Sequence, residues 1–314
     1  MGLFFRLYPL RFSFRAREPV YFPPGKSANI LRGAFGMVFR RIACIPHCPG
    51  ARECEIREQC AYARMFEPSA VAPGPSGLTD WPRPFVFRAD HLDGRTIAPG
   101  ECFYFDLNLF DMHGPAIAYL VLTFSELGRE GFGPGRKRAD LVEVSQIGME
   151  GEAGAPIYDG SSFVLREAPP PMVLDLAPLS ERAERVRVRF VTPTELKSGQ
   201  RLAERPEFPV LAGRIRDRLS TLRELYDDGP LPIDFRGFGE RAGQVRMTRC
   251  DIRLVRVERR SSRTGEVHSI GGFVGEAEYE GELAEFVPYL RAAKWAGVGR
   301  QTVWGKGEVE ISVR

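Results

Sequence analysis

Residues 185–196 read RVRVRFVTPTEL, and charged and apolar side chains alternate along most of this stretch. Alternation with a period of two is typical of a strand that buries one face. The elements expected after it are a helix at 210–226, strands at 245–259 and 268–279, a second helix at 283–295 and a last strand at 308–313. The polar connection RSSRTGEV predicts that the two middle strands form a hairpin. This order, βαββαβ, is the ferredoxin-like arrangement.

The first half of the chain repeats the same order. Its expected elements are strands at 3–14, 85–89, 102–110 and 140–146, with helices at 28–42 and 115–127. We therefore predict an α+β protein of two tandem ferredoxin-like domains, each with a glycine-rich loop before its last strand. The predicted domains are residues 1–147, with a cysteine-rich insertion at about 44–80, and residues 185–314. Residues 148–184 are rich in Gly, Pro and Ala and are expected to connect them.

Composition limits the function classes only broadly. No apolar run approaches the ~18 residues of a membrane span, so we expect a cytoplasmic protein without a membrane partner. The net charge of +3 does not by itself identify a nucleic-acid binder, but five of the 44 basic residues are lysine and 39 are arginine. Arginine suits phosphates and stacking on bases, although a GC-rich genome also favours its codons. Arginines gather at 182–189 and 246–263, and the second stretch predicts a strand with one very basic face.

The two glycine-rich loops, GFGPGRKR at 131–138 and GVGRQTVWGKG at 297–307, each follow a predicted helix and precede a strand. A dinucleotide fingerprint has the opposite order, strand then helix, so these loops are not Rossmann sites. Glycine lets the backbone approach a ligand, and successive N–H groups can bind phosphate oxygens. The alternative is that the glycines only form a tight turn packed against the sheet. The residues expected to contact RNA are Gly297, Gly299, Arg300, Gly305, Lys306, Gly307, Arg136, Lys137, Arg138, Arg260 and Arg263.

Several segments resemble a known family. The loop GVGRQTVWGKGEVEI resembles the glycine-rich signature of the RAMP superfamily of CRISPR-associated proteins. ILRGAFGMVFRRIAC, followed by closely spaced cysteines and CAYARMFEP, is similar to the N-terminal part of its repeat-RNA processing family. FRGFGERAGQV and RRSSRTGEVHSIGGFVGEAEYEG resemble that family's C-terminal domain.

The resemblance implies a metal-independent endoribonuclease that binds and cuts CRISPR repeat RNA in the precursor transcript. In the implied mechanism, the 2′-hydroxyl attacks the neighbouring phosphate and the cut RNA ends in a 2′,3′-cyclic phosphate. One alternative is a non-catalytic RNA-binding RAMP subunit of a CRISPR effector complex, whose other subunits would be its partners. Another is an unrelated metalloprotein in which the cysteines carry the function.

Such a cut requires a proton acceptor, a proton donor and a cation, and histidine is the usual choice near neutral pH. The resemblance places a catalytic histidine at His47, just beyond the first helix. Solvent exposure or metal ligation is the competing interpretation of His47. His268, on the basic hairpin, is the second candidate. By analogy with the family, Lys26 is expected to approach the cleft of His47 as the cation, and Tyr21 to fill the third role.

Cys44, Cys48, Cys54 and Cys60 fall within 17 residues, spaced C-x3-C-x5-C-x5-C. A cluster of thiols in the reducing cytoplasm favours metal binding over disulfides. Zinc takes four cysteines, or three cysteines and a histidine, but the spacing lacks the CxxC pair of familiar zinc sites. A structural zinc is therefore one expectation, and an iron–sulfur cluster or unmetallated thiols are the alternatives. No cofactor is expected to take part in catalysis, and a zinc-bound His47 could not serve as the base.

Overall fold

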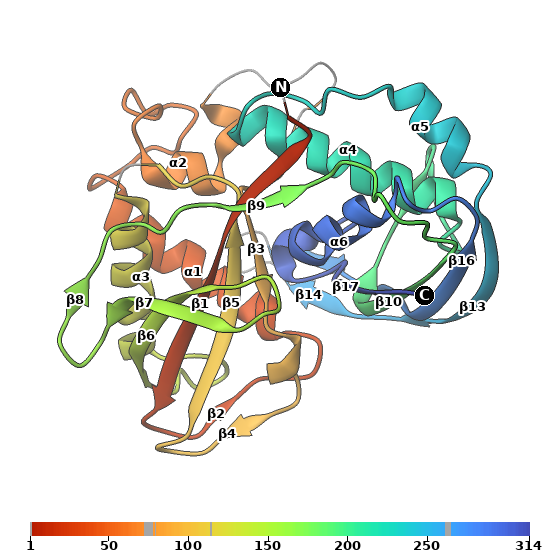
Figure 1. Cartoon of the computed structure of the whole chain (residues 1–314). Coiled ribbons are helices and arrows are strands. Elements are labelled where there is room, and N and C mark those ends of the chain that lie inside the picture. Colours follow the sequence, from red (N-terminus) through yellow and green to blue (C-terminus); the bar gives the residue numbers. More distant parts are fainter. Residues whose placement is uncertain (1, 72–77, 79, 114, 261–264) are drawn as a thin grey trace. The chain divides into compact units, whose positions relative to one another are not determined.

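A computed structural model describes residues 2–71, 78, 80–113, 115–260 and 265–314, and it divides into two compact units (Figure 1). We call residues 7–172 the N-terminal unit, and residues 1–6 with 173–314 the C-terminal unit. The first residues belong to the second unit because Arg6 pairs with Asp227 at 2.8 Å and Leu176 N–H donates to Leu3 O at 2.8 Å. Among the described helices, none is long and apolar enough to cross a membrane.

The N-terminal unit contains the predicted βαββαβ order. Its elements are β1 (Phe4–Ala16), α1 (Ser27–Ala43), β3 (Phe85–Arg88), β5 (Cys102–Leu109), α3 (Ala116–Glu130) and β6 (Ala139–Ile147). The strands lie in the order β3-β5-β1-β6, all antiparallel neighbours. This is the ferredoxin-like sheet, with the first and third strands in the centre, so the predicted fold is confirmed here.

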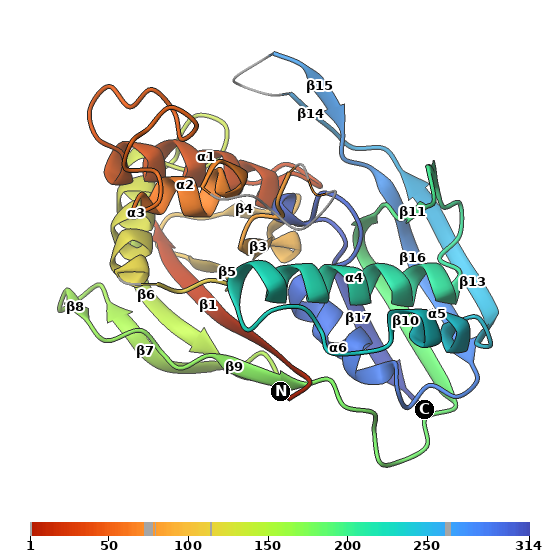
Figure 2. The same cartoon turned by 90° about the horizontal axis from the view of Figure 1, so that it is seen from above.

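Phenylalanines fill the space between this sheet and its two helices. Phe12 of β1 lies 4.4 Å from Phe124 of α3, and Phe124 stacks on Phe35 of α1 at 5.0 Å, both between ring centroids. All three side chains are fully buried. The alternation along β1 therefore has a simple cause, because its apolar residues face the helices that cover one side of the sheet (Figure 2).

Smaller elements complete this unit. They are β2 (Val20–Tyr21), which pairs with β4 (Thr96–Ile97), α2 (Ala61–Phe66), and the 3-10 turns Pro68–Ala70 and Asp90–Leu92. Residues 148–184, expected to be a connection, include β7 (Ala153–Asp159), β8 (Val164–Leu165) and β9 (Met172–Asp175). β7 and β8 extend the sheet beyond β6, and β9 pairs with β1. Glycine, proline and alanine hide the alternation that identifies strands elsewhere in the chain.

The C-terminal unit repeats the arrangement. Its elements are β10 (Arg185–Thr194), α4 (Phe208–Tyr226), β13 (Arg246–Val255), β16 (Gly272–Glu280), α6 (Val287–Ala296) and β17 (Val309–Val313). The strand order β13-β16-β10-β17 is again that of a ferredoxin-like sheet. Shorter pieces are β11 (Lys197–Ser198), β12 (Arg201–Leu202), β14 (Glu258–Arg260), β15 (Val267–Ser269) and the 3-10 turn Thr302–Trp304.

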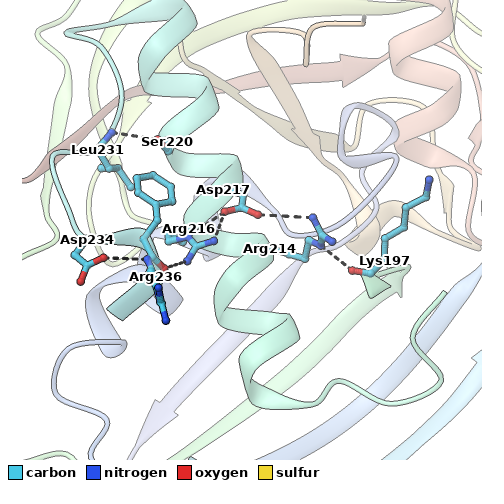
Figure 3. Close-up of polar contacts among 9 residues, drawn as sticks. Lys197, Arg214, Arg216, Asp217, Ser220, Leu231, Asp234 and Arg236 are labelled. Atoms are coloured by element: carbon cyan, nitrogen blue, oxygen red, sulfur yellow. Dashed lines mark hydrogen bonds and ion pairs between the residues drawn. The ribbon is translucent and has the colours of Figure 1, made fainter. Parts of the chain in front are cut away.

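Sequence patterning missed one helix of this unit, α5 (Phe235–Ala242). Asp234 caps it, since its carboxylate accepts hydrogen bonds from the backbone N–H groups of Arg236 and Gly237 at 3.1 Å. Arg216 of α4 holds the start of the helix by donating to Phe235 O at 2.7 Å (Figure 3). The aspartate at the N-cap is the signal that could have identified this helix from the sequence.

Candidate nucleic-acid interface

The glycine-rich loop after α6 folds back onto the end of β10. Val298 N–H donates to Gly307 O at 2.8 Å, Arg300 N–H to Glu195 O at 3.0 Å, and Gly307 N–H to Pro193 O at 3.1 Å. Gly299 and Gly307 both have positive φ, +78° and +70°. A Cβ on Gly307 would overlap the carbonyl oxygen of Val298, and one on Gly299 would overlap that of Glu195. Close backbone packing therefore accounts for both glycines.

This packing changes the interpretation of the loop. The N–H groups of Val298, Arg300 and Gly307 already donate to backbone carbonyl groups. The expectation that successive N–H groups of this loop bind phosphate oxygens is therefore wrong for these three residues. Lys306 is only 4% exposed, so its expected contact with RNA conflicts with its burial. Arg300 is exposed but pairs with Glu195 at 2.5 Å. The loop thus presents less free positive charge than its sequence indicates.

In the first glycine-rich loop, Lys137 and Arg138 also have an acidic neighbour. Arg138 Nε donates to a Glu18 carboxylate oxygen at 3.0 Å, and Lys137 lies 3.7 Å from the same carboxylate. A hydrogen bond from the Arg138 backbone N–H, helped by the Arg138 side chain, lowers the pKa of Glu18. Arg136 is exposed, with φ of +46°.

Glutamates pair with several arginines of the C-terminal sheet, which makes it less basic than the arginines alone predict. Glutamates of β16 lie beside arginines of β10 and β13, and Glu310 of β17 lies beside Arg189. The pairs are Arg187–Glu278 at 2.7 Å, Arg187–Glu276 at 3.7 Å, Arg246–Glu280 at 3.3 Å, Arg189–Glu310 at 3.0 Å and Arg185–Glu280. Sequence reasoning considered each strand separately, whereas strand register determines which charges become neighbours.

Arg259 differs from these paired arginines. It lies on β14, which pairs with β15 to form a two-stranded ribbon that extends from the ends of β13 and β16 (Figure 2). Its guanidinium lies over the Trp304 ring, 4.2 Å from the centroid. Burial lowers the pKa of Arg259, and its Nε has no hydrogen-bond partner among the described residues. A desolvated guanidinium on an aromatic ring is suited to bind an anion.

Other contacts join the ribbon to the glycine-rich loop. Gln301 Nε2 donates to Ser269 O, at the end of β15, at 2.9 Å. His268 is the cross-strand partner of Arg259, and its Nε2 lies 3.6 Å from Glu266. The structure thus brings together an unneutralised arginine, an exposed histidine and Trp304. Arg263 and the Arg260 side chain, which were also expected to contact RNA, lie outside the described residues.

The other predicted catalytic residues do not come together. Lys26 is the residue just before α1, and Tyr21 precedes it on β2, whereas His47 follows the other end of the helix. At 1.5 Å per residue, the 17-residue helix separates its two ends by about 25 Å. The expected cleft shared by Lys26 and His47 is therefore wrong. The cations nearest to His47 along the chain are Arg52 and Arg41, the latter in the last turn of α1, and sequence reasoning did not consider them as partners of His47.

The four clustered cysteines do come together. Cys44, Cys48, Cys54 and Cys60 all line one small cavity, whose wall also includes Arg40 and Arg57. His47 is exposed and does not line this cavity. In the described part of the chain, no group of three or more His, Cys, Asp or Glu side chains is arranged as a metal site.

Two family models match the sequence. AF_1859_N, described as an N-terminal domain, matches residues 5–173, and the model described as CRISPR-associated endoribonuclease Cas6 matches residues 188–309. The C-terminal part of the chain thus matches the CRISPR-associated endoribonuclease Cas6 model, and the N-terminal part matches AF_1859_N. The β14–β15 ribbon and the second glycine-rich loop both lie inside the Cas6 match.

Several solved structures have a similar fold. A Cas6 product complex has a TM-score of 0.57 at 19% identity and covers 98% of this chain and 99% of that chain. Thermus thermophilus Cas6 has a TM-score of 0.55 at 18% identity with the same coverage. A partial Cas6-RT-Cas1–Cas2 complex has a TM-score of 0.57 at 12% identity and covers 99% of this chain and 46% of that chain. A search of curated proteins found no match.

Proposed function

We propose that this chain binds the repeat of a CRISPR precursor RNA and cuts it once per repeat by attack of the 2′-hydroxyl on the neighbouring phosphate. The observation that carries the proposal is the Arg259 guanidinium on Trp304, beside His268, within the segment that matches the Cas6 family model. Two of the similar solved structures are product complexes of Cas6 proteins, which supports an RNA-cutting function for this chain.

The charge balance of the C-terminal unit supports placing the RNA backbone on the ribbon. Glutamates oppose the arginines on the open face of the sheet, so that face would gain little by binding phosphates. Arg259 has lost part of its hydration and has no carboxylate that raises its pKa. A phosphate would provide the charged acceptor that this guanidinium lacks. Trp304, under the guanidinium, is also an aromatic surface on which an unpaired base can stack.

The chemistry needs a base at the 2′-oxygen, an acid at the departing 5′-oxygen and a cation at the phosphorane. When the 2′-oxygen loses its proton and bonds to phosphorus, the phosphorus–5′-oxygen bond breaks and the 5′-oxygen takes up a proton. The products are a 2′,3′-cyclic phosphate and a 5′-hydroxyl, without net uptake of protons or water. Protein side chains suffice for these transfers, so we propose that no metal is required for the cut.

Two histidines are candidates for proton transfer. His268 is directly opposite Arg259 in the β14–β15 register, so a base and a phosphorane-stabilising cation would lie side by side. His47, the position favoured by the family resemblance, lies in the loop after α1, apart from Lys26 and Tyr21. The proposal therefore includes both histidines as candidate bases, and only a variant series can distinguish them.

The test is cleavage of a repeat-containing RNA in EDTA, after circular dichroism has shown that the chelated protein remains folded. A single cut that disappears when the attacking 2′-hydroxyl is replaced by hydrogen is the expected result. Loss of the general base should slow cutting about 10²- to 10⁴-fold, in either His47→Ala or His268→Ala. His113→Ala is the matched control, since His113 is exposed and pairs with Asp111.

Arg259→Ala tests the binding surface. Loss of one charge-assisted phosphate contact should weaken RNA binding about 10- to 100-fold. The slope of log K against log salt should fall by about 0.7–0.9. Arg236→Ala is the control, because Arg236 is exposed on α5 and pairs with Glu240. Equal affinities for the two variants would remove Arg259 from the interface.

Binding without a cut would favour the alternative function, a non-catalytic RAMP subunit. One similar structure is part of a Cas6-RT-Cas1–Cas2 complex, which supports the proposal that this chain works beside other CRISPR proteins. Cutting that persists with the deoxy substrate would refute the 2′-hydroxyl mechanism. No binding at all would refute the RNA proposal itself.

A further inference from the structure

We propose that Cys44, Cys48, Cys54 and Cys60 bind one structural zinc ion that ties the end of α1 to the start of α2. The proposed ligands are the four thiolates alone, without His47. All four cysteines line a single cavity. Cys102 and Cys250, the two remaining cysteines, are outside this cavity.

The local backbone explains how residues 16 positions apart meet. Cys44 is the C-cap of α1, with its N–H bonded to Arg40 O at 2.9 Å, and Cys60 is the N-cap of α2. Two successive turns join Cys54 to Cys60, since Arg57 N–H donates to Cys54 O at 3.3 Å and Cys60 N–H to Arg57 O at 3.2 Å. The cavity therefore lies at the junction of two helices.

Packing holds both ends of the 44–60 segment but little of its interior. α2 docks on α1 through Phe66, whose ring centroid lies 5.0 Å from Phe35 and 5.8 Å from Phe39. Between the helices only Ala51 and Cys54 are buried, while Ile45 and Ile56 are 50% and 47% exposed. A segment with so little buried apolar surface needs another source of order, which a bound metal supplies in many small motifs.

Charge in the cavity wall also favours this ion. Zinc with four thiolates carries a net charge of −2, and such a site is costly to enclose without compensation. The guanidinium-bearing residues Arg40 and Arg57 line the same cavity and would provide two positive charges. The thiols line the cavity but are not arranged as a coordination sphere among the described residues, so zinc binding would require changes in their side-chain rotamers.

The test uses the full chain, purified with a reductant and without chelator, then equilibrated with Zn²⁺ and dialysed. We expect one zinc per chain by mass spectrometry, and its release as a mercurial reagent titrates four thiols. Replacement by Co²⁺ should give intense thiolate-to-cobalt charge-transfer bands. Cys48→Ser and Cys60→Ser should lose both signals, whereas Cys102→Ser and Cys250→Ser should keep them.

A structural readout accompanies the metal analysis. Chelation of the wild-type protein should speed tryptic cleavage at Arg52 and Arg57, inside the cysteine segment, and leave the rest of the digestion pattern unchanged. Protein that retains no zinc after dialysis would overturn the proposal, as would disulfides among the four cysteines or an iron–sulfur chromophore. Zinc that survives in the Cys48→Ser and Cys60→Ser variants would overturn this ligand set.

Discussion

The substitution Gly307→Ala separates the two interpretations of the second glycine-rich loop. If glycine is there for close backbone packing, alanine should destabilise the C-terminal unit. If glycine is there for close approach of RNA, alanine should reduce affinity and leave stability unchanged. The structure favours packing, because a Cβ on Gly307 would overlap Val298 O.

The size of the effect follows from three contributions. A left-handed backbone costs alanine about 1–2 kcal/mol. Displacing the residue weakens two hydrogen bonds, Val298 N–H to Gly307 O and Gly307 N–H to Pro193 O, each worth about 1 kcal/mol. Alanine also restricts the unfolded chain, which offsets about 0.4–1 kcal/mol of this loss of stability. We therefore expect the free energy of unfolding to fall by about 3 kcal/mol.

Gly229→Ala is the matched control. Gly229 lies in the same unit with φ of +89°, but a Cβ there would have no atom within 4 Å. Only the left-handed backbone costs stability there, and the restricted unfolded chain offsets part of that cost. The free energy of unfolding should therefore fall by only about 1 kcal/mol. The difference between the two variants isolates the cost of the overlap.

The assay is urea unfolding followed by tryptophan fluorescence. Both Trp295 and Trp304 lie in the C-terminal unit, and Trp81→Phe removes the tryptophan of the other unit. For a slope of about 2 kcal/mol per molar urea, Gly307→Ala should lower the midpoint by about 1.5 M. Identical midpoints for the two glycine variants would refute the packing argument. A loss of RNA affinity at unchanged stability would then support the ligand-approach interpretation.

Two further predictions concern single contacts. Tyr279→Phe removes the buried hydrogen bond that the Tyr279 hydroxyl donates to Pro206 O at 2.7 Å. In urea unfolding of the C-terminal unit, the free energy of unfolding should fall by about 1–3 kcal/mol. Tyr21→Phe, at an exposed tyrosine, should leave the free energy of unfolding almost unchanged. Arg138→Ala should return the lowered pKa of Glu18 only part of the way in a carbon-13 NMR titration, because the backbone N–H bond remains. Since that pKa is depressed on folding, Glu18 stabilises the fold above its unfolded pKa, and the effect is lost as pH falls through the folded value. A full return to the usual value would show that the side chain alone lowers it.

Local patterns in the sequence determined the repeated βαββαβ order. Alternation along β1 and β10 and the apolar stripe of α4 reflect which face each element buries, and that information lies within a few neighbouring residues. The cysteine cluster was also visible from its spacing. Where composition hid the pattern, as in β7 and β8, prediction failed.

Only the tertiary structure decided which charges remain free. The arginines of β10 and β13 looked alike in sequence. Antiparallel register sets glutamates of β16 beside most of them but Val274 opposite Arg253, while Arg259 lies on Trp304. The length of α1 separates Lys26 from His47, which no short-range pattern reveals. Burial of Lys306 likewise depends on how the loop folds back onto β10. The fold follows from local burial patterns, whereas the site depends on contacts between residues far apart in the chain, and these exist only once the chain has folded.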